Sequence, residues 1–347
     1  MKLVGKGAMV WQLRMWQGGI PVYQAMEAAA LGLNWVSIKI TDGCREKWEP
    51  GTTTNMNLLP ATVPALRAAG IKVYAWSWLW GPKVIWDFAK GFYVQNTPKK
   101  EAAAAVAVCR KYGIEHLQIN AEASYRGHRE YAEAYCLEVN NSAPDIEYSL
   151  CSYRYPVTGQ PDFPTSTFAP QVDAWCPQVY FLLDNRVNGG ALQLVESERQ
   201  YRIIKSLPYF PIAPTYPYGY KDAAGVRHEW RAKKDQLLAL FLRAKADGCQ
   251  AVGVWDLPQA SDQQKLALKE FSFGTAPPPS PAQWLVVVAG NLRTLATTNA
   301  PVIRLLPVGT VVAVLETGFG AAQDWKKIQA GPEIGYFWDP GYKLQPV

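Results

Sequence analysis

A single carboxylate, Glu122, follows a short apolar segment and is the strongest candidate for chemistry in this sequence. Residues 116–120 read His-Leu-Gln-Ile-Asn, which predicts a buried strand that brings Glu122 to its end. Burial among tryptophan and tyrosine rings would raise the pKa of this acid, because desolvation disfavours its charged form. An acid of this kind suits proton donation to a glycosidic oxygen. The alternative is a structural ion pair with Arg126 or Arg154.

Polar and aromatic residues also follow the other predicted strands, where they could line a saccharide groove. Asn120 is a second catalytic candidate, although an amide at a strand end often only satisfies a loop backbone. Asp42 could be a second catalytic carboxylate, but Thr-Asp-Gly is also a common turn sequence. Asp256 could contribute to catalysis or substrate binding, or merely cap the last helix. The other predicted substrate-binding residues are one amide and five rings that could stack on sugars or pack in the core: Gln178, Trp78, Tyr153, Tyr180, Tyr216 and Trp255.

The elements that must position these residues alternate between strand and helix from residue 8 to residue 273. Eight apolar strands alternating with helices predict an α/β fold, a closed (β/α)8 TIM barrel with its chemistry at the carboxyl ends of the strands. The predicted strands are 8–13, 35–40, 72–78, 116–120, 147–153, 174–181, 211–216 and 251–255, and the predicted helices are 21–31, 58–69, 100–112, 129–139, 166–171, 192–206, 229–246 and 262–271. No GxGxxG turn follows the first strand and no P-loop motif occurs, so no nucleotide cofactor is expected.

The sequence changes character after residue 273. Residues 274–283 are rich in proline and predict a stiff linker between a barrel over 1–273 and a second module over 284–347. Short β-rich runs separated by turn residues predict that this module is all-β. It resembles the bacterial SH3-like cell-wall-binding domain through the order of these segments: Asn291-Leu292-Arg293, Ala300-Pro301-Val302-Ile303, Leu306-Pro307-Val308-Gly309-Thr310-Val311-Val312, Asp324-Trp325-Lys326-Lys327-Ile328, Gly335-Tyr336 and Tyr342-Lys343-Leu344. The resemblance implies a small β-barrel that tethers a wall-degrading enzyme to peptidoglycan.

The larger domain resembles the muramidases of glycoside hydrolase family 25 in two places. The segment 35–43, Trp-Val-Ser-Ile-Lys-Ile-Thr-Asp-Gly, is similar to the second-strand segment of that family, in which an acid precedes a glycine. Asn120-Ala121-Glu122 occupies the place of the family's Asp-x-Glu. The sequence departs from the family because residues 9–13 lack an aspartate and Asn120 replaces the first acid.

A second resemblance, to the chitinase-type barrels of family 18, is carried by Gln178-Val179-Tyr180 and Val254-Trp255. That family implies a single glutamate as proton donor, with the N-acetyl group of the substrate as nucleophile, an exception to paired-carboxylate catalysis. The pair Asn120 and Glu122 also resembles the Asn-x-Glu pair of the family 85 endo-β-N-acetylglucosaminidases. This implies that Asn120 orients the acetamido group while Glu122 is the general acid/base.

The composition narrows the classes of partner. The net charge of +6 favours mild attraction to polyanions, but no Lys/Arg block indicates a nucleic-acid partner. The 14 Trp and 18 Tyr residues exceed what a core needs and favour sugar binding. His116, His128 and His228 show no ligand spacing, so no metal is expected. No serine or cysteine lies in a nucleophile-elbow pattern, which argues against an esterase or amidase.

Targeting signals are also missing from the sequence. Residues 1–9 form no apolar leader, and no apolar run approaches the roughly 20 residues that cross a bilayer, so we expect no signal peptide and no membrane insertion. The six scattered cysteines indicate free thiols and a reducing compartment, hence synthesis in the cytoplasm.

The expected function is an endolysin-like hydrolase of peptidoglycan or a related amino-sugar polysaccharide, either a muramidase or an endo-β-N-acetylglucosaminidase. We expect a phage or prophage origin, with the protein released through a holin or carried in a virion. The alternatives are an inactive barrel that binds carbohydrate as a virion or surface protein, and a glycosidase for a non-wall polysaccharide.

Overall fold

The structure is a computed structural model that describes residues 3–46, 48, 54–222, 224–273, 283–286, 290–307, 310–319, 325–330, 333–339 and 344–346. It divides into two compact units, and each is described by itself. One unit comprises Met1–Gly19, Leu33–Pro60 and Lys72–Thr275, and the other comprises Ile20–Gly32, Ala61–Ile71 and Ala276–Val347. Within the described residues, no helix is both long enough and apolar enough to cross a bilayer.

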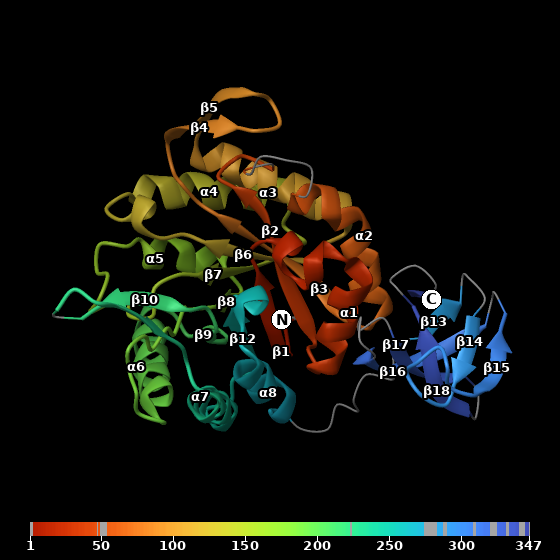
Figure 1. Cartoon of the computed structure of the whole chain (residues 1–347). Helices are drawn as coiled ribbons and strands as arrows, with labels where there is room; N and C mark the ends of the chain where they lie inside the picture. Colours follow the sequence, from red (N-terminus) through yellow and green to blue (C-terminus); the bar gives the residue numbers. More distant parts are fainter. Residues whose placement is uncertain are drawn as a thin grey trace. The chain divides into compact units, whose positions relative to one another are not determined.

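Eight parallel strands in the first unit form a closed ring and confirm the predicted (β/α)8 TIM-barrel fold (Figure 1). Their order around the ring is β8-β7-β6-β3-β2-β1-β12-β9. The ring closes where Trp175 pairs with Tyr209 and Gln178 pairs with Ile212, both in parallel. The strands are β1 Gly5–Val10, β2 Trp35–Asp42, β3 Lys72–Trp78, β6 His116–Asn120, β7 Glu147–Cys151, β8 Ala174–Trp175, β9 Ile212–Pro214 and β12 Ala251–Trp255.

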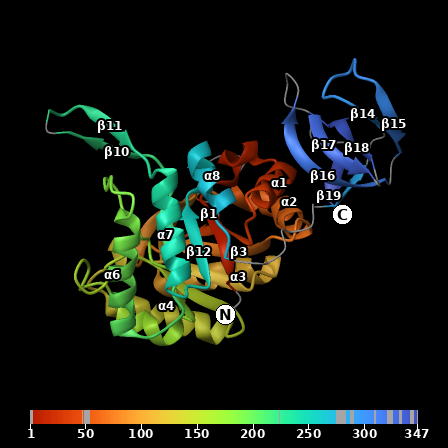
Figure 2. The ribbon, with the colours of Figure 1, turned by 90° about the horizontal axis from the view of Figure 1, so that it is seen from below.

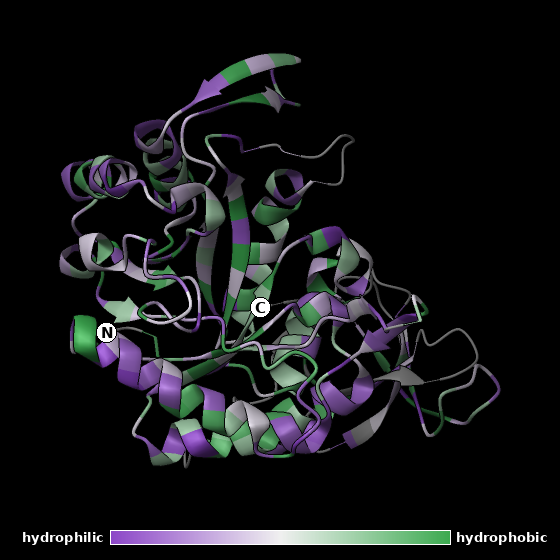
Figure 3. Ribbon diagram, turned by 90° about the vertical axis from the view of Figure 1, so that its left-hand side faces the viewer, coloured by the Kyte–Doolittle hydropathy of each residue, from purple (hydrophilic) through white to green (hydrophobic). Residues whose placement is uncertain are grey.

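Helices alternate with these strands along the chain, and both ends of α3 have a local cause in the sequence. In α3, Thr97 accepts a hydrogen bond from the Lys100 backbone at 3.3 Å, Pro98 fits the first turn, and Gly113 ends the helix at a φ of 59°. Figure 3 shows both apolar and polar stretches on the helices, as expected for helices that cover a sheet. The helices are α1 Pro21–Ala30, α2 Asn55–Ala68, α3 Pro98–Tyr112, α4 Arg129–Ser142, α5 Thr165–Phe168, α6 Gly189–Ile204, α7 Lys234–Ala246 and α8 Asp262–Glu270, with short 3-10 turns at η1 Leu13–Met15, η2 Gln17–Gly19, η3 Ala123–Tyr125, η4 Ala169–Gln171 and η5 Leu257–Gln259.

Two antiparallel hairpins extend the loops that follow strands of the barrel. The first joins β4 Lys83–Asp87 to β5 Phe92–Asn96, in a segment where the sequence analysis predicted no strand. The second joins β10 Tyr218–Lys221 to β11 Arg227–Trp230, and Figures 1 and 2 both show it extending away from the barrel. The predicted helix 229–246 is therefore wrong in its first turn, because Glu229 and Trp230 pair with β10 and the helix begins at Lys234.

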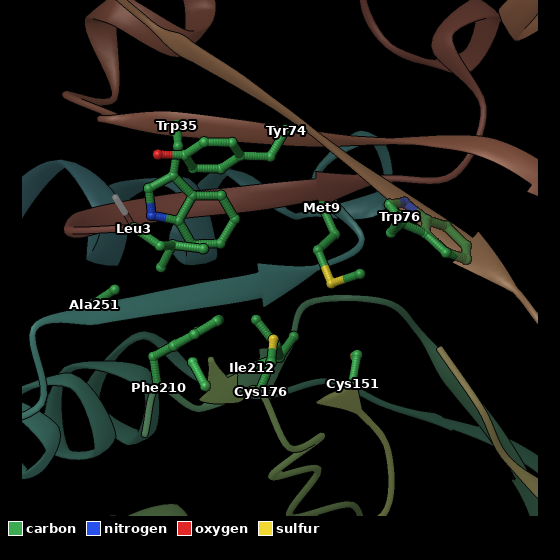
Figure 4. Packing of buried hydrophobic residues seen from close by; sticks show 11 residues of the cluster. Leu3, Met9, Trp35, Tyr74, Trp76, Cys151, Cys176, Phe210, Ile212 and Ala251 are labelled. Atoms are coloured by element: carbon green, nitrogen blue, oxygen red, sulfur yellow. The ribbon is translucent and has the colours of Figure 1, made fainter. Parts of the chain in front are cut away.

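Large side chains from several strands fill the barrel interior (Figure 4). Trp35 is fully buried, and two glycines, one on β1 and one on β12, make room for its indole. A Cβ on Gly7 would lie 2.0 Å from Trp35 Cδ2, and one on Gly253 would lie 2.7 Å from Trp35 Cη2. The cluster also contains Leu3, Met9, Tyr74, Trp76, Cys151, Ala174, Cys176, Phe210, Ile212 and Ala251, with Trp78, Tyr180 and Trp255 packed against it.

The C-terminal region is a small antiparallel all-β sheet, as predicted. Its strand order is β15-β14-β18-β17-β16-β13-β19. The strands are β13 Gln283–Val286, β14 Gly290–Arg293, β15 Val302–Leu306, β16 Val311–Phe319, β17 Trp325–Ala330, β18 Glu333–Trp338 and β19 Leu344–Pro346. Leu292, Leu306, Val312, Ile328 and Phe337 are among the residues of its core. Of the predicted linker, residues 274–282 lie outside the described residues, and Gln283 begins β13.

Candidate active site

Glu122 lies two residues beyond β6, at the carboxyl end of the barrel strands. All five residues of β6 are buried, and its alternate residues His116, Gln118 and Asn120 share one face of the strand. The His116 ring lies 3.0 Å from a serine hydroxyl on β7, and Gln118 Nε2 donates to Cys176 Sγ at 3.0 Å. Since Cys176 belongs to the core cluster, this face points into the barrel. The strand therefore carries a polar column that ends with Asn120 beside Glu122.

Two amides hold the Glu122 carboxylate. Gln178 Nε2 donates to Glu122 Oε1 at 2.6 Å. The side-chain amide of Asn120 is assigned with its nitrogen toward Cys151 and Glu122. In this orientation Asn120 Nδ2 donates to the Cys151 carbonyl at 3.0 Å and to Glu122 Oε1 at 3.1 Å. The closure of the barrel brings Gln178 to this position, because the same residue pairs with Tyr153 on one side and with Ile212 on the other. Three predicted site residues thus meet at one carboxyl group.

The surroundings of Glu122 favour its neutral, protonated form. Burial raises the pKa of Glu122, and the hydrogen bonds from Gln178 and Asn120 only partly offset that rise. Both arginines considered as ion-pair partners are engaged elsewhere. Arg126 Nε donates to the Asp162 carboxylate at 2.9 and 3.0 Å, and Arg154 Nη1 donates to the Tyr180 carbonyl and to a glutamine. Glu122 therefore keeps its proton to a higher pH than an ordinary glutamate, which suits a general acid.

Tyrosine rings lie near this acid. Tyr180 and Tyr216 meet edge to face with their ring centroids 5.6 Å apart. Burial raises the pKa of Tyr153 and raises that of Tyr216 to about 12, and in both residues the nearby charge of Glu122 adds to the rise. Trp255 contacts the Trp76 ring edge to face at 4.8 Å. Tyr153, Tyr180 and Tyr216 are thus the predicted rings on which the charge of Glu122 acts, and Trp78 pairs with Asn120 across the sheet. Trp255 packs on Trp76, which the sequence analysis did not single out.

Asp42 has a different environment from Glu122. Its carboxylate accepts from Lys39 Nζ at 2.7 Å and from Trp80 Nε1 at 3.1 Å, and it forms an ion pair with Arg45. Burial alone would raise the pKa of Asp42, but the charges of Lys39 and Arg45 and the bonds from Lys39 and Trp80 leave it below its ordinary value. Asp42 is thus an ionised, fully engaged carboxylate. A direct catalytic role for it remains a prediction from the sequence.

Lys39 is a buried cation that sequence reasoning missed. Its Nζ lies 5.8, 4.8 and 5.3 Å from the ring centroids of Trp11, Trp48 and Trp76. Indole faces attract cations, and together with Asp42 these rings compensate the charge of Lys39 in a buried place. The available signal was a lysine inside the apolar segment 35–40, at the strand position that shares a face with Ser37 and Thr41.

Glu101 is a second buried charged residue that the sequence did not reveal. Its Oε1 accepts from the backbone amides of Trp80 and Gly81 at 2.6 and 3.1 Å and from Asn96 Nδ2 at 2.7 Å. Its Oε2 accepts from the Tyr125 hydroxyl at 2.6 Å. The loop after β3, the end of β5 and the turn after Glu122 all converge on this side chain. Glu101 therefore fixes the loops that form this part of the barrel mouth.

Asp256 follows β12 and is buried. Its Oδ1 accepts from the Trp11 backbone amide at 3.1 Å, and its Oδ2 accepts from Gln259 Nε2 at 3.1 Å. The cap of the last helix is provided by Ser261 with Gln264, so Asp256 does not cap that helix. Burial raises the pKa of Asp256 to about 6.

Because burial raises the pKa of Asp256, the free energy of unfolding should fall as pH rises. The folded-state pKa of about 6 lies above the ordinary aspartate pKa of 3.8, so the native state binds the proton more tightly and loses stability as pH rises through this window. The loss amounts to at most about 3 kcal/mol. We expect Asp256→Asn to raise Tm relative to wild type by more at pH 8 than at pH 4, as measured by thermal unfolding. The same Tm difference at every pH would contradict this assignment.

Metal ligands were not expected, and the described residues contain no group of three or more His, Cys, Asp or Glu side chains that could hold a metal ion. Each of the three histidines contacts a different set of residues. His116 belongs to the β6 column, His128 stacks on Tyr131 with ring centroids 4.2 Å apart, and His228 lies 2.8 Å from Asp222.

Comparison with known proteins supports the fold. No protein-family model matches the sequence, and no curated protein matches it either. The spore cortex-lytic enzyme SleL from Bacillus cereus is a similar solved structure, with a TM-score of 0.53, 12% identity and coverage of 76% of this chain and 73% of that chain. A chitinase from Chromobacterium violaceum gives a TM-score of 0.53 at 12% identity, covering 77% and 98% of the two chains. A mutant family 18 chitinase from Cycas revoluta, solved in complex with (GlcNAc)4, gives 0.52 at 10% identity, covering 77% and 98%.

Proposed function

We propose that the barrel is a glycoside hydrolase acting on amino-sugar polymers, with Glu122 as its general acid/base. The observation that carries the proposal is the Glu122 carboxyl group itself, which is half-buried, bound by two amides and close to aromatic rings. A neutral acid in such a place can donate a proton to a glycosidic oxygen. The similar solved structures are named as chitinases and a spore cortex-lytic enzyme, and this supports the same class of substrate.

The single acid favours substrate-assisted catalysis. In this mechanism Glu122 protonates the glycosidic oxygen while the carbonyl oxygen of the substrate's acetamido group attacks the anomeric carbon. Asn120 orients the acetamido group through its side-chain amide. Glu122, now ionised, then takes a proton from the water that opens the cyclic intermediate. The sugar rings stack against walls formed by Trp78, Tyr180, Tyr216 and Trp255, with Tyr153, Gln178 and Asp256 completing the proposed binding residues.

An endo-β-N-acetylglucosaminidase fits this arrangement better than a muramidase with two carboxylates. A second catalytic carboxylate would have to be free to attack a sugar or activate water. The candidate Asp42 is held by Lys39, Arg45 and Trp80. Asn120 stands where the muramidase pattern has its first acid, and its amide is bonded to the Glu122 carboxylate instead.

Peptidoglycan is the proposed polymer, and the C-terminal module is the reason for choosing it over chitin. Residues 284–347 resemble an SH3-like wall-binding domain, which we propose is joined to the barrel of residues 1–273 by the proline-rich linker 274–283. Such a module would keep the enzyme on the bacterial cell wall. Release through a holin, or transport in a virion, belongs to the same proposal and is suggested by the sequence alone.

An inactive, carbohydrate-binding barrel is the second candidate, because Asn120 replaces an acid next to Glu122. Incubating the full-length protein with purified cell walls and with chitin oligosaccharides separates the two functions. We expect reducing ends to appear, and mass spectrometry of the products identifies the bond cleaved. Pelleting with walls without any release of reducing ends would instead support the binding protein.

A further inference from the structure

A cavity of about 450 Å³ lies outside the Glu122 site, between the β4–β5 hairpin, the start of α3 and the loop after β2. Nothing in the catalytic proposal uses it. Its lining includes one side chain from the loop, four from the hairpin and one from the helix: Cys44, Lys90, Phe92, Tyr93, Gln95 and Lys100.

Two ammonium groups give this cavity a positive charge. Lys100 Nζ donates to the Gln95 carbonyl at 2.9 Å, and Lys90 Nζ lies 3.5 Å from Asp87 Oδ2. A lysine ammonium group has three N–H donors, so both can take a further acceptor. Both lysines line this cavity together with Cys44, and their charges lower the pKa of its thiol against the larger raising effects of burial and of Glu101. The acid Glu101 also acts on Cys44 but is itself fully buried.

Exposed aromatic rings adjoin these cations. Phe92 is 55% exposed and Tyr93 is 66% exposed, which is unusual for such large apolar side chains. Tyr93 pairs across the hairpin with Trp86, and their rings meet edge to face at 5.1 Å. Rings of this kind stack on sugars and on apolar parts of peptides. The cavity therefore suits an anionic group attached to a sugar or peptide body.

The cavity lies on the same rim of the barrel as Glu122. The Gly43 amide donates to the Trp78 carbonyl at 2.7 Å, and the Leu79 amide donates to the Asn120 carbonyl at 3.0 Å. The loop that carries Cys44 thus starts beside the end of β3, and the loop that leads into the hairpin starts beside the end of β6. A polymer bound at Glu122 could extend a side group toward the hairpin.

We infer that this cavity binds a carboxylate on a short peptide substituent of the amino-sugar polymer, so that the barrel prefers peptide-bearing glycan to bare glycan. This inference rests on the proposed function, since it assigns the substrate class of the same groove. A lysine pair with aromatic neighbours recognises the charge and the body of such a substituent together.

Binding measurements on the full chain test this preference without relying on turnover. The protein carries Glu122→Gln to prevent hydrolysis and is titrated with soluble glycan oligomers that bear peptide stems, and with the same oligomers after an amidase has removed the stems. We expect the stems to tighten Kd about tenfold. The double variant Lys90→Gln with Lys100→Gln should lose this difference, whereas Lys111→Gln, a lysine at the other end of α3, should retain it.

Each outcome has a separate meaning. Any contribution of the C-terminal region to stem binding is the same in all three proteins, so only the lysine-dependent part reports on the cavity. Equal Kd values with and without stems, or a stem effect that survives the double variant, would overturn the inference. Stemless strands that carry wall phosphate form a third arm, and tight lysine-dependent binding of these strands would overturn the peptide assignment. A wild-type protein without hydrolase activity would refute the proposed function and leave the binding result intact.

Discussion

Glu122→Gln should abolish the release of reducing ends from cell walls or chitin oligosaccharides, lowering kcat at least about a thousandfold. The glutamine preserves the shape of the side chain and can keep the contact with Gln178, but it cannot donate a proton to the leaving oxygen. Since Gln178 and Asn120 are amides, neither neighbour can take over the proton. The measurement is initial rates at saturating substrate, together with sedimentation with walls, which should remain unchanged.

The matched control is Glu133→Gln on α4, whose side chain is exposed and pairs with Arg129. This variant should retain full activity. Asn120→Ala should lower kcat while the protein still binds walls, because the acetamido group would lose its partner and Glu122 would keep its proton. If Glu122→Gln remained as active as the wild type, the assignment of the general acid would be wrong.

Glu101→Ala should destabilise the barrel more than any surface substitution, by about 4 kcal/mol. Alanine would leave the Trp80 and Gly81 amides, Asn96 and the Tyr125 hydroxyl without their acceptor in a buried place. For a domain of this size such a loss lowers Tm by about 8 to 16 °C. Thermal unfolding followed by circular dichroism measures it.

Glu101→Gln provides the graded comparison. Its oxygen can accept from the three nitrogen donors, and its amide can donate to the Tyr125 oxygen, so the expected loss of stability is much smaller. Glu133→Ala, at the same exposed position as the activity control, should change Tm by no more than about 1 °C. A Tm drop for Glu101→Ala that matched this control would show that water or a rearranged loop satisfies the four donors.

The barrel could be predicted from the sequence because its strands are buried on both faces and read as compact apolar runs. The segments 72–78, 116–120 and 251–255 agree with β3, β6 and β12 to the residue. The predicted strands differ from the observed ones where pairing depends on residues distant in the sequence. The predicted strand 174–181 is reduced to β8 because Pro177 lacks a backbone N–H, and the hairpins were missed because their exposed strands have no apolar periodicity.

The candidate site was predicted in part for the same reason. Asn120 and Glu122 lie at a strand end that the apolar pattern marks, and the structure brings Gln178 to them. The contact between Gln178 and Glu122 joins residues 56 positions apart and exists only because the ring closes. Glu101 could not be recognised, since charged residues in the first turn of a helix usually lie at the surface, and Lys39 was missed although its place inside an apolar strand was a signal.

The polar column of β6 also limits how protons could move in the proposed reaction. Gln118 and Asn120 carry amides, which neither store nor release a proton near neutral pH, so no relay runs from Glu122 down the strand. In the proposed reaction the proton that Glu122 gives to the departing sugar must be replaced by the incoming water. Glu122 then regains its proton within each catalytic cycle. It titrates as a single group and not as one of two coupled carboxyl groups.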